Sequence, residues 1–130
     1  MIVGRDEDAR MMLRTILEQW NYDVFEAADP DESIKAARDR LPSLVLLDSS
    51  LPFSDTLNDV AKLSESAEFE DIPSVMMSGY PQENYREAAL NSGAAGYLVK
   101  PIDFDALRTY IHTLTGSQAE NNERTNFRNL

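Results

Sequence analysis

The sequence predicts a single α/β domain in which a parallel β-sheet carries helices on both of its faces. Five short apolar segments alternate with five segments of helical periodicity, and two of the apolar segments are apolar at every interior position. Such alternation is typical of βα units joined into a parallel sheet, and fully apolar strands belong in its middle. A chain of 130 residues is long enough for one hydrophobic core and too short for two.

The first element is a short strand, the apolar stretch IV, after which the chain changes abruptly to charge in GRDED. A helix is predicted after Asp6, with Glu7 and Asp8 in its first turn, where the helix dipole favours negative charge. One face of this helix is apolar at the spacing of a buried stripe: Leu13, Ile16, Leu17 and Trp20. The charged loop therefore lies at the end of the first strand.

The next two strands flank a helix with a clear start signal. Residues 22–27 alternate in polarity like a short strand. The helix in DPDESIKAARDRL is predicted to have Asp29 as its N-cap, Pro30 at its first position and Glu32 three residues after the cap. Residues 43–48, SLVLLD, are apolar until Asp48 and suit a central strand covered on both faces.

The second half of the chain continues the alternation. A weaker helix is predicted at residues 56–67 and a fourth strand at residues 73–78. The helix near residues 82–92 is expected to end at Gly93, because glycine adopts the left-handed conformation of many helix ends. The fifth strand, residues 95–99, ends at Lys100 and Pro101. The last helix is predicted to begin after the N-cap Asp103, to stop at Gly116, and to bury one face: Leu107, Tyr110, Ile111 and Leu114.

Composition excludes several classes of function. Acidic residues outnumber basic ones by 23 to 12, giving a net charge of −11, and no basic stripe is present, so direct nucleic-acid binding is not expected. The absence of cysteine excludes disulfides and thiol chemistry. No segment has the length of a membrane span or the pattern of a secretory signal, so a cytoplasmic location is expected. The polar residues 117–130 are predicted to form a C-terminal tail or linker.

The residues that follow the strands should carry the chemistry, because parallel sheets place their ligand crevice at the carboxyl ends of the strands. These residues are Gly4 to Asp6, Asp48, Ser78 and Lys100. Each alone has an ordinary structural role, since Asp and Ser are common turn and cap residues. His112, the only histidine, is expected to be structural or exposed, because no catalytic partner lies near it in the sequence.

Taken together, the segments LVLLDSSLP, VMMSG and GYLVKP resemble the three downstream motifs of the response-regulator receiver domain of two-component signalling. Their spacing agrees with the family, and the resemblance covers residues 1–116. It implies a doubly wound, flavodoxin-like sheet with strand order 2-1-3-4-5. It also implies a non-enzymatic phosphorelay module. The upstream partner would be a sensor histidine kinase or phosphotransfer protein, and the downstream partner an effector protein or a removed output domain.

The resemblance assigns a role to each matching residue. Asp48 would be the phosphoacceptor, Lys100 would place a cation on the phosphoryl oxygens, and Ser78 would donate a hydrogen bond to them. Tyr97 matches the aromatic switch residue that turns inward when Ser78 moves. The bond between Lys100 and Pro101 matches a cis peptide that aims the lysine into the pocket.

The end of the first strand departs from the family pattern. Members normally have two adjacent acids there to hold Mg²⁺, whereas this chain has Gly4 and Arg5, with Asp6 one place later. The remaining candidate ligands are Asp48, Asp6 and the backbone carbonyl of Ser50, so Mg²⁺ binding is predicted to be weak or absent. We hypothesise that Asp6 faces the pocket and that Arg5 partly replaces the metal, pairing with Asp48 at rest and with phosphoryl oxygens afterwards.

Two other functions remain open. A pseudo-receiver would bind its partner without regard to phosphate, and the lost acid pair favours this alternative. A phosphohydrolase with Asp48 as nucleophile is the weaker alternative, because such enzymes use a second acid two residues later, where this chain has Ser50. Phosphorylation of Asp48 separates the receiver from the pseudo-receiver, and phosphate release from small phosphomonoesters identifies the enzyme.

Overall fold

The computed structural model describes residues 1–49 and 52–115. Within these ranges it confirms the predicted parallel sheet of five strands in the order β2-β1-β3-β4-β5. The strands are β1 (Ile2–Val3), β2 (Glu26–Ala27), β3 (Val45–Asp48), β4 (Ser74–Ser78) and β5 (Gly96–Val99). The helices are α1 (Glu7–Gln19), α2 (Pro30–Asp39), α3 (Phe53–Glu65), α4 (Glu83–Asn91) and α5 (Phe104–Leu114), with a short 3₁₀ helix, η1 (Ala67–Phe69). None of the helices in these ranges is long and apolar enough to cross a membrane.

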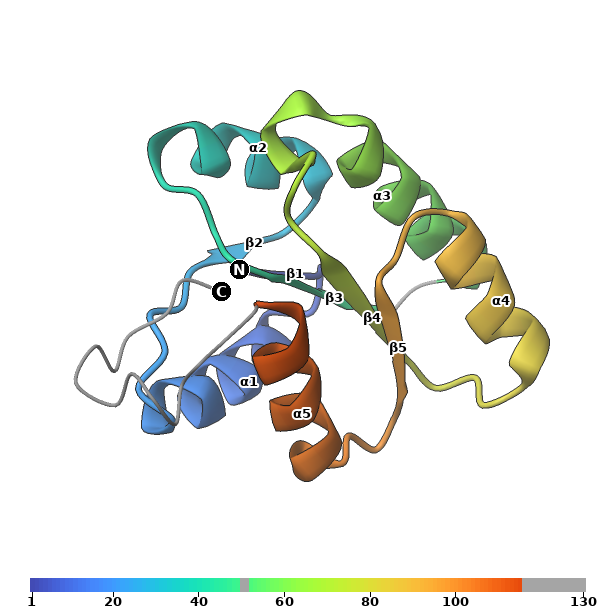
Figure 1. Cartoon of the computed structure of the whole chain (residues 1–130). Coiled ribbons are helices and arrows are strands. Elements are labelled where there is room, and N and C mark those ends of the chain that lie inside the picture. The colour runs from blue at the N-terminus through green and yellow to red at the C-terminus, as the bar shows by residue number, and fades with distance from the viewer. Residues whose placement is uncertain (50–51, 116–130) are drawn as a thin grey trace.

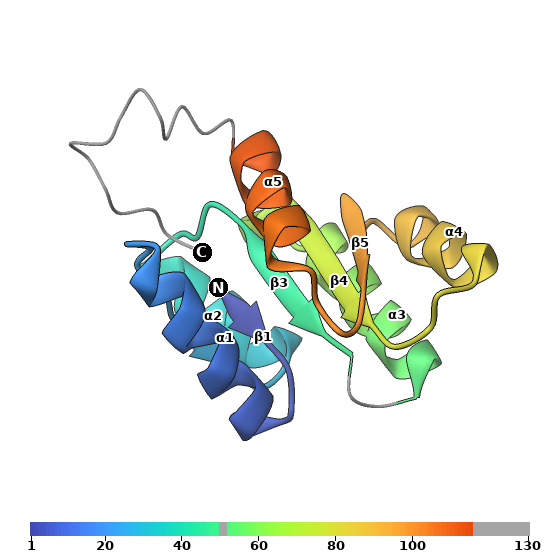
Figure 2. The same cartoon turned by 90° about the horizontal axis from the view of Figure 1, so that it is seen from below.

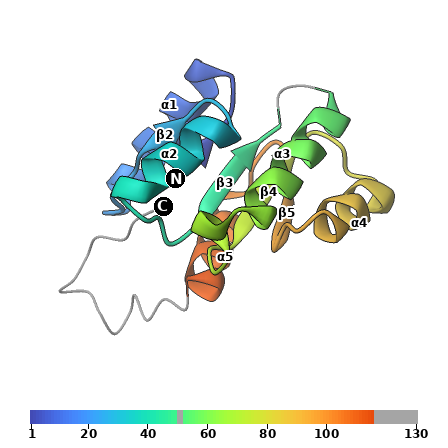
Figure 3. The ribbon, with the colours of Figure 1, turned by 90° about the horizontal axis from the view of Figure 1, so that it is seen from above.

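The helices cover both faces of the sheet. Figure 1 shows α1 and α5 on one face and α2, α3 and α4 on the other. The first face is nearer the viewer in Figure 2, and the second in Figure 3. Alternate residues of β3 enter opposite cores, with Val45 and Leu47 on the α2–α3–α4 side and Leu46 on the α1–α5 side. Water is thus excluded from both faces of β3, which explains its apolar interior positions.

Local signals fix the helix ends where the sequence predicts them. Asp29 caps α2 by accepting a hydrogen bond from the backbone N–H of Glu32 at 2.9 Å. Asp103 caps α5 and accepts from the backbone N–H of Asp105 at 2.9 Å. Gly93 follows α4 with a φ of +120°, a conformation that side chains disfavour. These three helices therefore begin or end as predicted.

Two elements differ from the prediction. β2 has only two residues, because its one neighbour, β1, offers only Ile2 and Val3 for pairing. α3 begins at Phe53, three residues earlier than predicted, directly after Pro52. Phe53 packs against the core on the α2–α3–α4 side, and this tertiary contact extends the helix beyond its weak local signal. The predicted boundary at Gly116 and the tail at residues 117–130 lie outside the described residues.

Candidate functional site

Three of the predicted site residues meet at the carboxyl edge of the sheet. In the strand register, Asp48 of β3 lies beside Met77, and Ser78 of β4 lies beside Val99. Lys100 directly follows β5, and its backbone N–H donates to the Ser78 carbonyl at 2.7 Å. The peptide bond after Lys100 is cis, as predicted. Three neighbouring strands thus bring a carboxylate, a hydroxyl and an ammonium group to one edge.

Asp48 and Lys100 form an ion pair at the centre of this edge. The Asp48 side chain is 3% exposed, and its Oδ1 lies 2.5 Å from Lys100 Nζ. The lysine also donates to the backbone carbonyl of Ser49 at 3.2 Å, which holds its ammonium group in place. Oδ2 of Asp48 is buried and has no hydrogen-bond partner in the described part of the chain. One oxygen of the carboxylate is therefore paired with the lysine, and the other has no partner among the described residues.

Ser78 and Tyr97 are linked through the backbone of Tyr80. The Ser78 side chain is fully buried, and its hydroxyl oxygen accepts from the Tyr80 N–H at 3.2 Å. Tyr97 is turned inward and is 6% exposed, and its hydroxyl donates to the Tyr80 carbonyl at 2.7 Å. Burial raises the pKa of Tyr97, and a hydrogen bond with Ser78 acts in the opposite direction.

The hypothesised pairing of Arg5 with Asp48 is wrong for this structure. Arg5 Nη1 lies 3.0 Å from Asp59 Oδ2 on α3, and the Arg5 side chain is 43% exposed. The hydrogen bond to Asp59 raises the pKa of Arg5, and the nearby carboxylates of Asp29 and Asp55 act in the same direction. Arg5 therefore points toward a group of acids outside the pocket. The cation that pairs with Asp48 is Lys100.

Asp6 does not face the pocket, contrary to the hypothesis. It is exposed, and its Oδ1 accepts from the backbone N–H groups of Asp8 at 3.0 Å and Ala9 at 3.2 Å. It is the N-cap of α1, a role for which a short carboxylate is well suited. No group of three or more Asp, Glu, His or Cys residues that could hold a metal occurs among the described residues. The candidate carbonyl ligand of Ser50 lies outside them.

Gly4 occupies a close contact between β1 and β3. A Cβ atom on Gly4 would lie 3.1 Å from Asp48 Cβ and 3.3 Å from the Asp48 carbonyl oxygen, closer than ordinary packing. Arg10 donates to the Gly4 carbonyl and also pairs with Glu26 at 3.0 Å, which holds the end of β1 from the other side. The sequence indicates only that Gly4 stands where an acid is expected, whereas the structure shows that a Cβ atom there would press on Asp48.

An apolar cavity of about 300 Å³ opens beside Asp48, between α1 and the start of α5. Its rim carries two large apolar side chains, Met12 at 56% exposure and Phe104 at 39%. Asp48 and Lys100 line it together with apolar residues: Ala9, Met12, Leu13, Met77, Pro101, Ile102 and Phe104. The only sequence signal for it is the position of Met12 outside the predicted buried face of α1.

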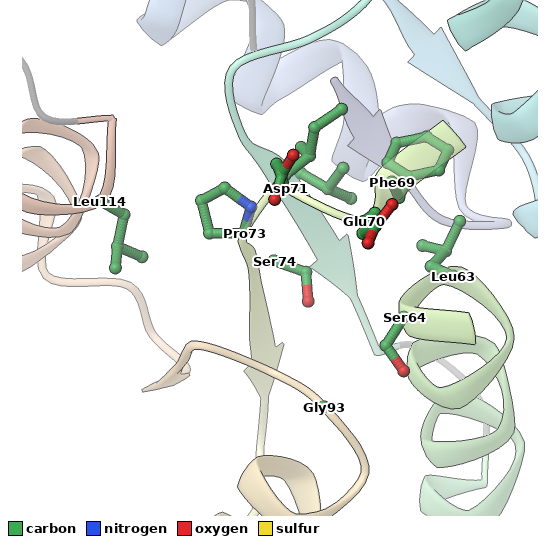
Figure 4. Close-up of a pocket in the computed structure, with 11 residues that line it drawn as sticks. Leu63, Ser64, Phe69, Glu70, Asp71, Pro73, Ser74, Gly93 and Leu114 are labelled. Carbon is green, nitrogen blue, oxygen red and sulfur yellow. The ribbon is translucent and has the colours of Figure 1, made fainter. Parts of the chain in front are cut away.

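A second cavity, of about 390 Å³, lies where β4 begins, at the opposite edge of the sheet (Figure 4). It is bounded by Pro73 and Ser74 at the start of β4, by Leu63 and Ser64 near the end of α3, and by Leu114 at the end of α5. None of the predicted site residues lines it. The candidate site is therefore the edge that holds Asp48.

A comparison with known families identifies the chain. The family model described as the response regulator receiver domain matches residues 1–112. The chain belongs to the response-regulator receiver domain family. It is thus a receiver domain of two-component signalling, a family of signalling modules that are generally not enzymes.

Several curated proteins resemble this receiver domain. An uncharacterized 14.6 kDa protein of Leptolyngbya boryana is 32% identical over 103 residues, which are 79% of each chain. The phosphate regulon regulator PhoB of Klebsiella pneumoniae is 33% identical over 78% of this chain and 44% of its own length. The regulator KdpE of Escherichia coli is 32% identical over 85% of this chain and 48% of its own. The chain spans less than half the length of these two transcriptional regulators.

Solved structures show the same fold. The receiver domain of NtrX from Brucella abortus is 25% identical, with a TM-score of 0.74 over 90% of this chain and 98% of that one. A putative response regulator from Chloroflexus aurantiacus has a TM-score of 0.76 at 22% identity, covering 89% of this chain and 96% of that one. The chain therefore has the receiver fold over most of its length.

Proposed function

We propose that this receiver domain accepts a phosphoryl group on Asp48 and that the modification changes which partner it binds. The observation that carries the proposal is the asymmetry of the Asp48 carboxylate. Oδ1 is held by Lys100 at 2.5 Å, whereas Oδ2 is buried without a partner among the described residues. A carboxylate is an effective nucleophile toward phosphorus when it is held in place and a nearby cation offsets the repulsion by phosphate, and Lys100 supplies both.

The proposed reaction transfers a phosphoryl group from a phosphohistidine or a small phosphodonor. Oδ2 of Asp48 attacks phosphorus, the bond from phosphorus to the leaving nitrogen or oxygen breaks, and the donor group leaves with that electron pair. Lys100 faces the negative charge of the transferred group and stabilises it. Such electrostatic stabilisation is the main form of catalysis in phosphoryl transfer. The Ser78 hydroxyl then donates a hydrogen bond to a phosphoryl oxygen.

The proposed upstream partner is a histidine kinase or phosphotransfer protein, since receiver domains interact with histidine kinases. The apolar cavity beside Asp48 supports this proposal, because its rim offers Met12 and Phe104 to an incoming apolar side chain. The downstream partner is an effector protein or an output domain.

We further propose that Mg²⁺ binds this site weakly or not at all. The receiver domain of the sensor histidine kinase PA1611 from Pseudomonas aeruginosa coordinates a magnesium ion in its active site cleft. Here the donors do not fit that ion well. Among the described residues that line the pocket, Asp48 is the one carboxylate. Asp6 caps α1, and Arg5 pairs with Asp59. A site for Mg²⁺ normally uses one or two carboxylates that are free to coordinate it.

Calorimetric titration with Mg²⁺ tests this part of the proposal. Wild type should show little heat, and Arg5→Asp should bind more tightly, because it adds a carboxylate and removes a cation. Gly4→Asp/Arg5→Asp is the second variant. Because a side chain at Gly4 would contact Asp48 closely, the acid at position 4 should increase the Mg²⁺ affinity less than the acid at position 5 does. Tight Mg²⁺ binding by wild type, or no gain in either variant, would contradict it.

The pseudo-receiver remains the second candidate, and the inward position of Tyr97 without a phosphoryl group favours it. Labelling with a small phosphodonor separates the two. The receiver predicts a hydroxylamine-labile phosphoryl group that Asp48→Asn cannot acquire at the wild-type rate, and Ser78→Ala should leave labelling intact while uncoupling it from partner binding. Phosphate release from small phosphomonoesters would instead indicate the phosphohydrolase.

A further inference from the structure

Four aromatic rings from four different segments meet beside the site. Phe53 is the first residue of α3, Tyr80 lies between β4 and α4, Tyr85 is in α4, and Tyr97 is in β5. The Phe53 ring packs edge-to-face against Tyr85 at 4.7 Å, Tyr80 at 5.8 Å and Tyr97 at 6.5 Å between ring centroids. Tyr80 stacks on Tyr85 at 4.5 Å with an angle of 16° between the rings. These are the favoured geometries of aromatic pairs.

Tyr97 is held at both ends of its side chain. Its hydroxyl donates to the Tyr80 carbonyl at 2.7 Å, and its ring packs against Phe53. Turning Tyr97 outward would break this partly buried hydrogen bond and remove one neighbour of the Phe53 ring. Both changes are unfavourable, because a hydrogen bond and the contacts between packed rings are lost.

None of these contacts depends on a phosphoryl group. The backbone of Tyr80, including its carbonyl, is held in place by two contacts. The Tyr80 ring is stacked on Tyr85 of α4, and the Tyr80 N–H donates to the Ser78 hydroxyl oxygen at 3.2 Å. Phe53, the first residue of α3, packs against the rings of Tyr80, Tyr85 and Tyr97. The inward position of Tyr97 is therefore satisfied by the resting protein itself.

We propose that Phe53, Tyr80 and Tyr85 form an aromatic clamp that holds Tyr97 inward before Asp48 is modified. This deepens the proposed function, because it concerns the output side of the same site. The surface around β5 and α4 then has one conformation in the resting protein. Phosphorylation changes the conformation of this surface less than it would if Tyr97 turned freely. Phe53 is a positioning residue in this account, since it acts through Tyr97 and does not touch Asp48.

The test measures the solvent accessibility of Tyr97 in the unmodified full chain. The protein is labelled with fluorotyrosine, and the fluorine NMR signal of Tyr97 is assigned from a Tyr97→Phe sample. Broadening by a soluble paramagnetic agent should be several-fold weaker for Tyr97 than for Tyr80, which is 42% exposed. Phe53→Leu should increase the broadening of Tyr97 several-fold, because the inward state loses its ring contacts.

Phe104→Leu is the matched control. Phe104 is likewise the first residue of its helix, but its ring packs against Trp20, away from the clamp. It should leave the Tyr97 signal unchanged. Equal effects of the two substitutions, or a wild-type Tyr97 as accessible as Tyr80, would overturn the clamp. Because no phosphoryl group is used, this result is independent of whether Asp48 accepts one.

Discussion

At the scale of single residues, the Asp48–Lys100 pair combines a nearly buried carboxylate with a cation that is 33% exposed. Such a pair contributes little net stability, yet removal of one partner leaves a buried charge uncompensated. We therefore expect Lys100→Met to lower the free energy of unfolding by about 3 kcal/mol, measured by urea denaturation. The double variant Asp48→Asn/Lys100→Met should recover most of this loss.

Lys62→Met is the control for that prediction. Lys62 pairs with Asp31, but both side chains are largely exposed, at 53% and 74%. Exposed pairs contribute little, so the denaturation midpoint should not move. If Lys100→Met is no more destabilised than Lys62→Met, the Asp48–Lys100 pair is not the buried contact that the structure describes.

Gly4 supports a second prediction at this scale. Gly4→Ala places a Cβ atom 3.1 Å from Asp48 Cβ, so β1 and β3 must separate or Asp48 must shift. We expect a loss of about 1–3 kcal/mol in unfolding free energy, as for other overpacked sites, together with slower phosphorylation. Gly79→Ala is the control, because a Cβ atom there meets nothing within 4 Å. Similar behaviour of the two variants would exclude a close contact at Gly4.

At the scale of elements, the structure gives Asp6 the role of N-cap at the start of α1. If Asp6 is only an N-cap, Asp6→Ser should keep the stability of the protein and Asp6→Ala should cost about 1 kcal/mol, as cap removal does. Asp103→Ala, which removes the equivalent cap of α5, should cost a similar amount. Neither change at Asp6 should alter the Mg²⁺ affinity of the Arg5→Asp variant in calorimetry. A clear loss of affinity when Asp6→Ser is added to Arg5→Asp would instead identify Asp6 as a ligand.

The burial of Tyr97 in β5 should make the stability of the protein depend on pH. Burial raises the pKa of this tyrosine above its ordinary value, so the folded state holds the phenolic proton more tightly than the unfolded state. Its contribution to stability is complete below about pH 10, the ordinary tyrosine pKa, and is lost as pH rises above it. The stability advantage of wild type over Tyr97→Phe, measured by urea denaturation, should therefore shrink as the pH rises above about 10. A growing advantage would contradict the burial of Tyr97.

At the scale of the whole molecule, the parts of the fold that depend on local signals could be predicted from the sequence. The caps at Asp29 and Asp103, the glycine after α4, and the doubly covered β3 and β4 each have a signature within a few residues. β2 could not be bounded in this way, because its length depends on pairing with a two-residue neighbour. Alternation of polarity indicates an extended segment but not the extent of its partner strand.

The candidate site was predictable only in part, for the same reason. The edge position of Asp48, Ser78 and Lys100 follows from the order of the strands. The partner of Arg5 could not be predicted from the sequence, because Asp59 lies 54 positions away. Arg5 pairs with Asp59 because the fold brings several acids close to the arginine. The aromatic contacts of Phe53 likewise join it to three tyrosines that lie far from it in the sequence.

The central claim is that Asp48 accepts a phosphoryl group in a pocket whose resident cation is Lys100. Intact mass after exposure to a small phosphodonor tests it most directly, with wild type and Asp48→Asn each incubated in Mg²⁺ and in a chelator. We predict that wild type gains the mass of one phosphoryl group to a similar extent in both conditions, and that Asp48→Asn gains none. No gain by wild type in either condition, or an equal gain by Asp48→Asn, would contradict the account.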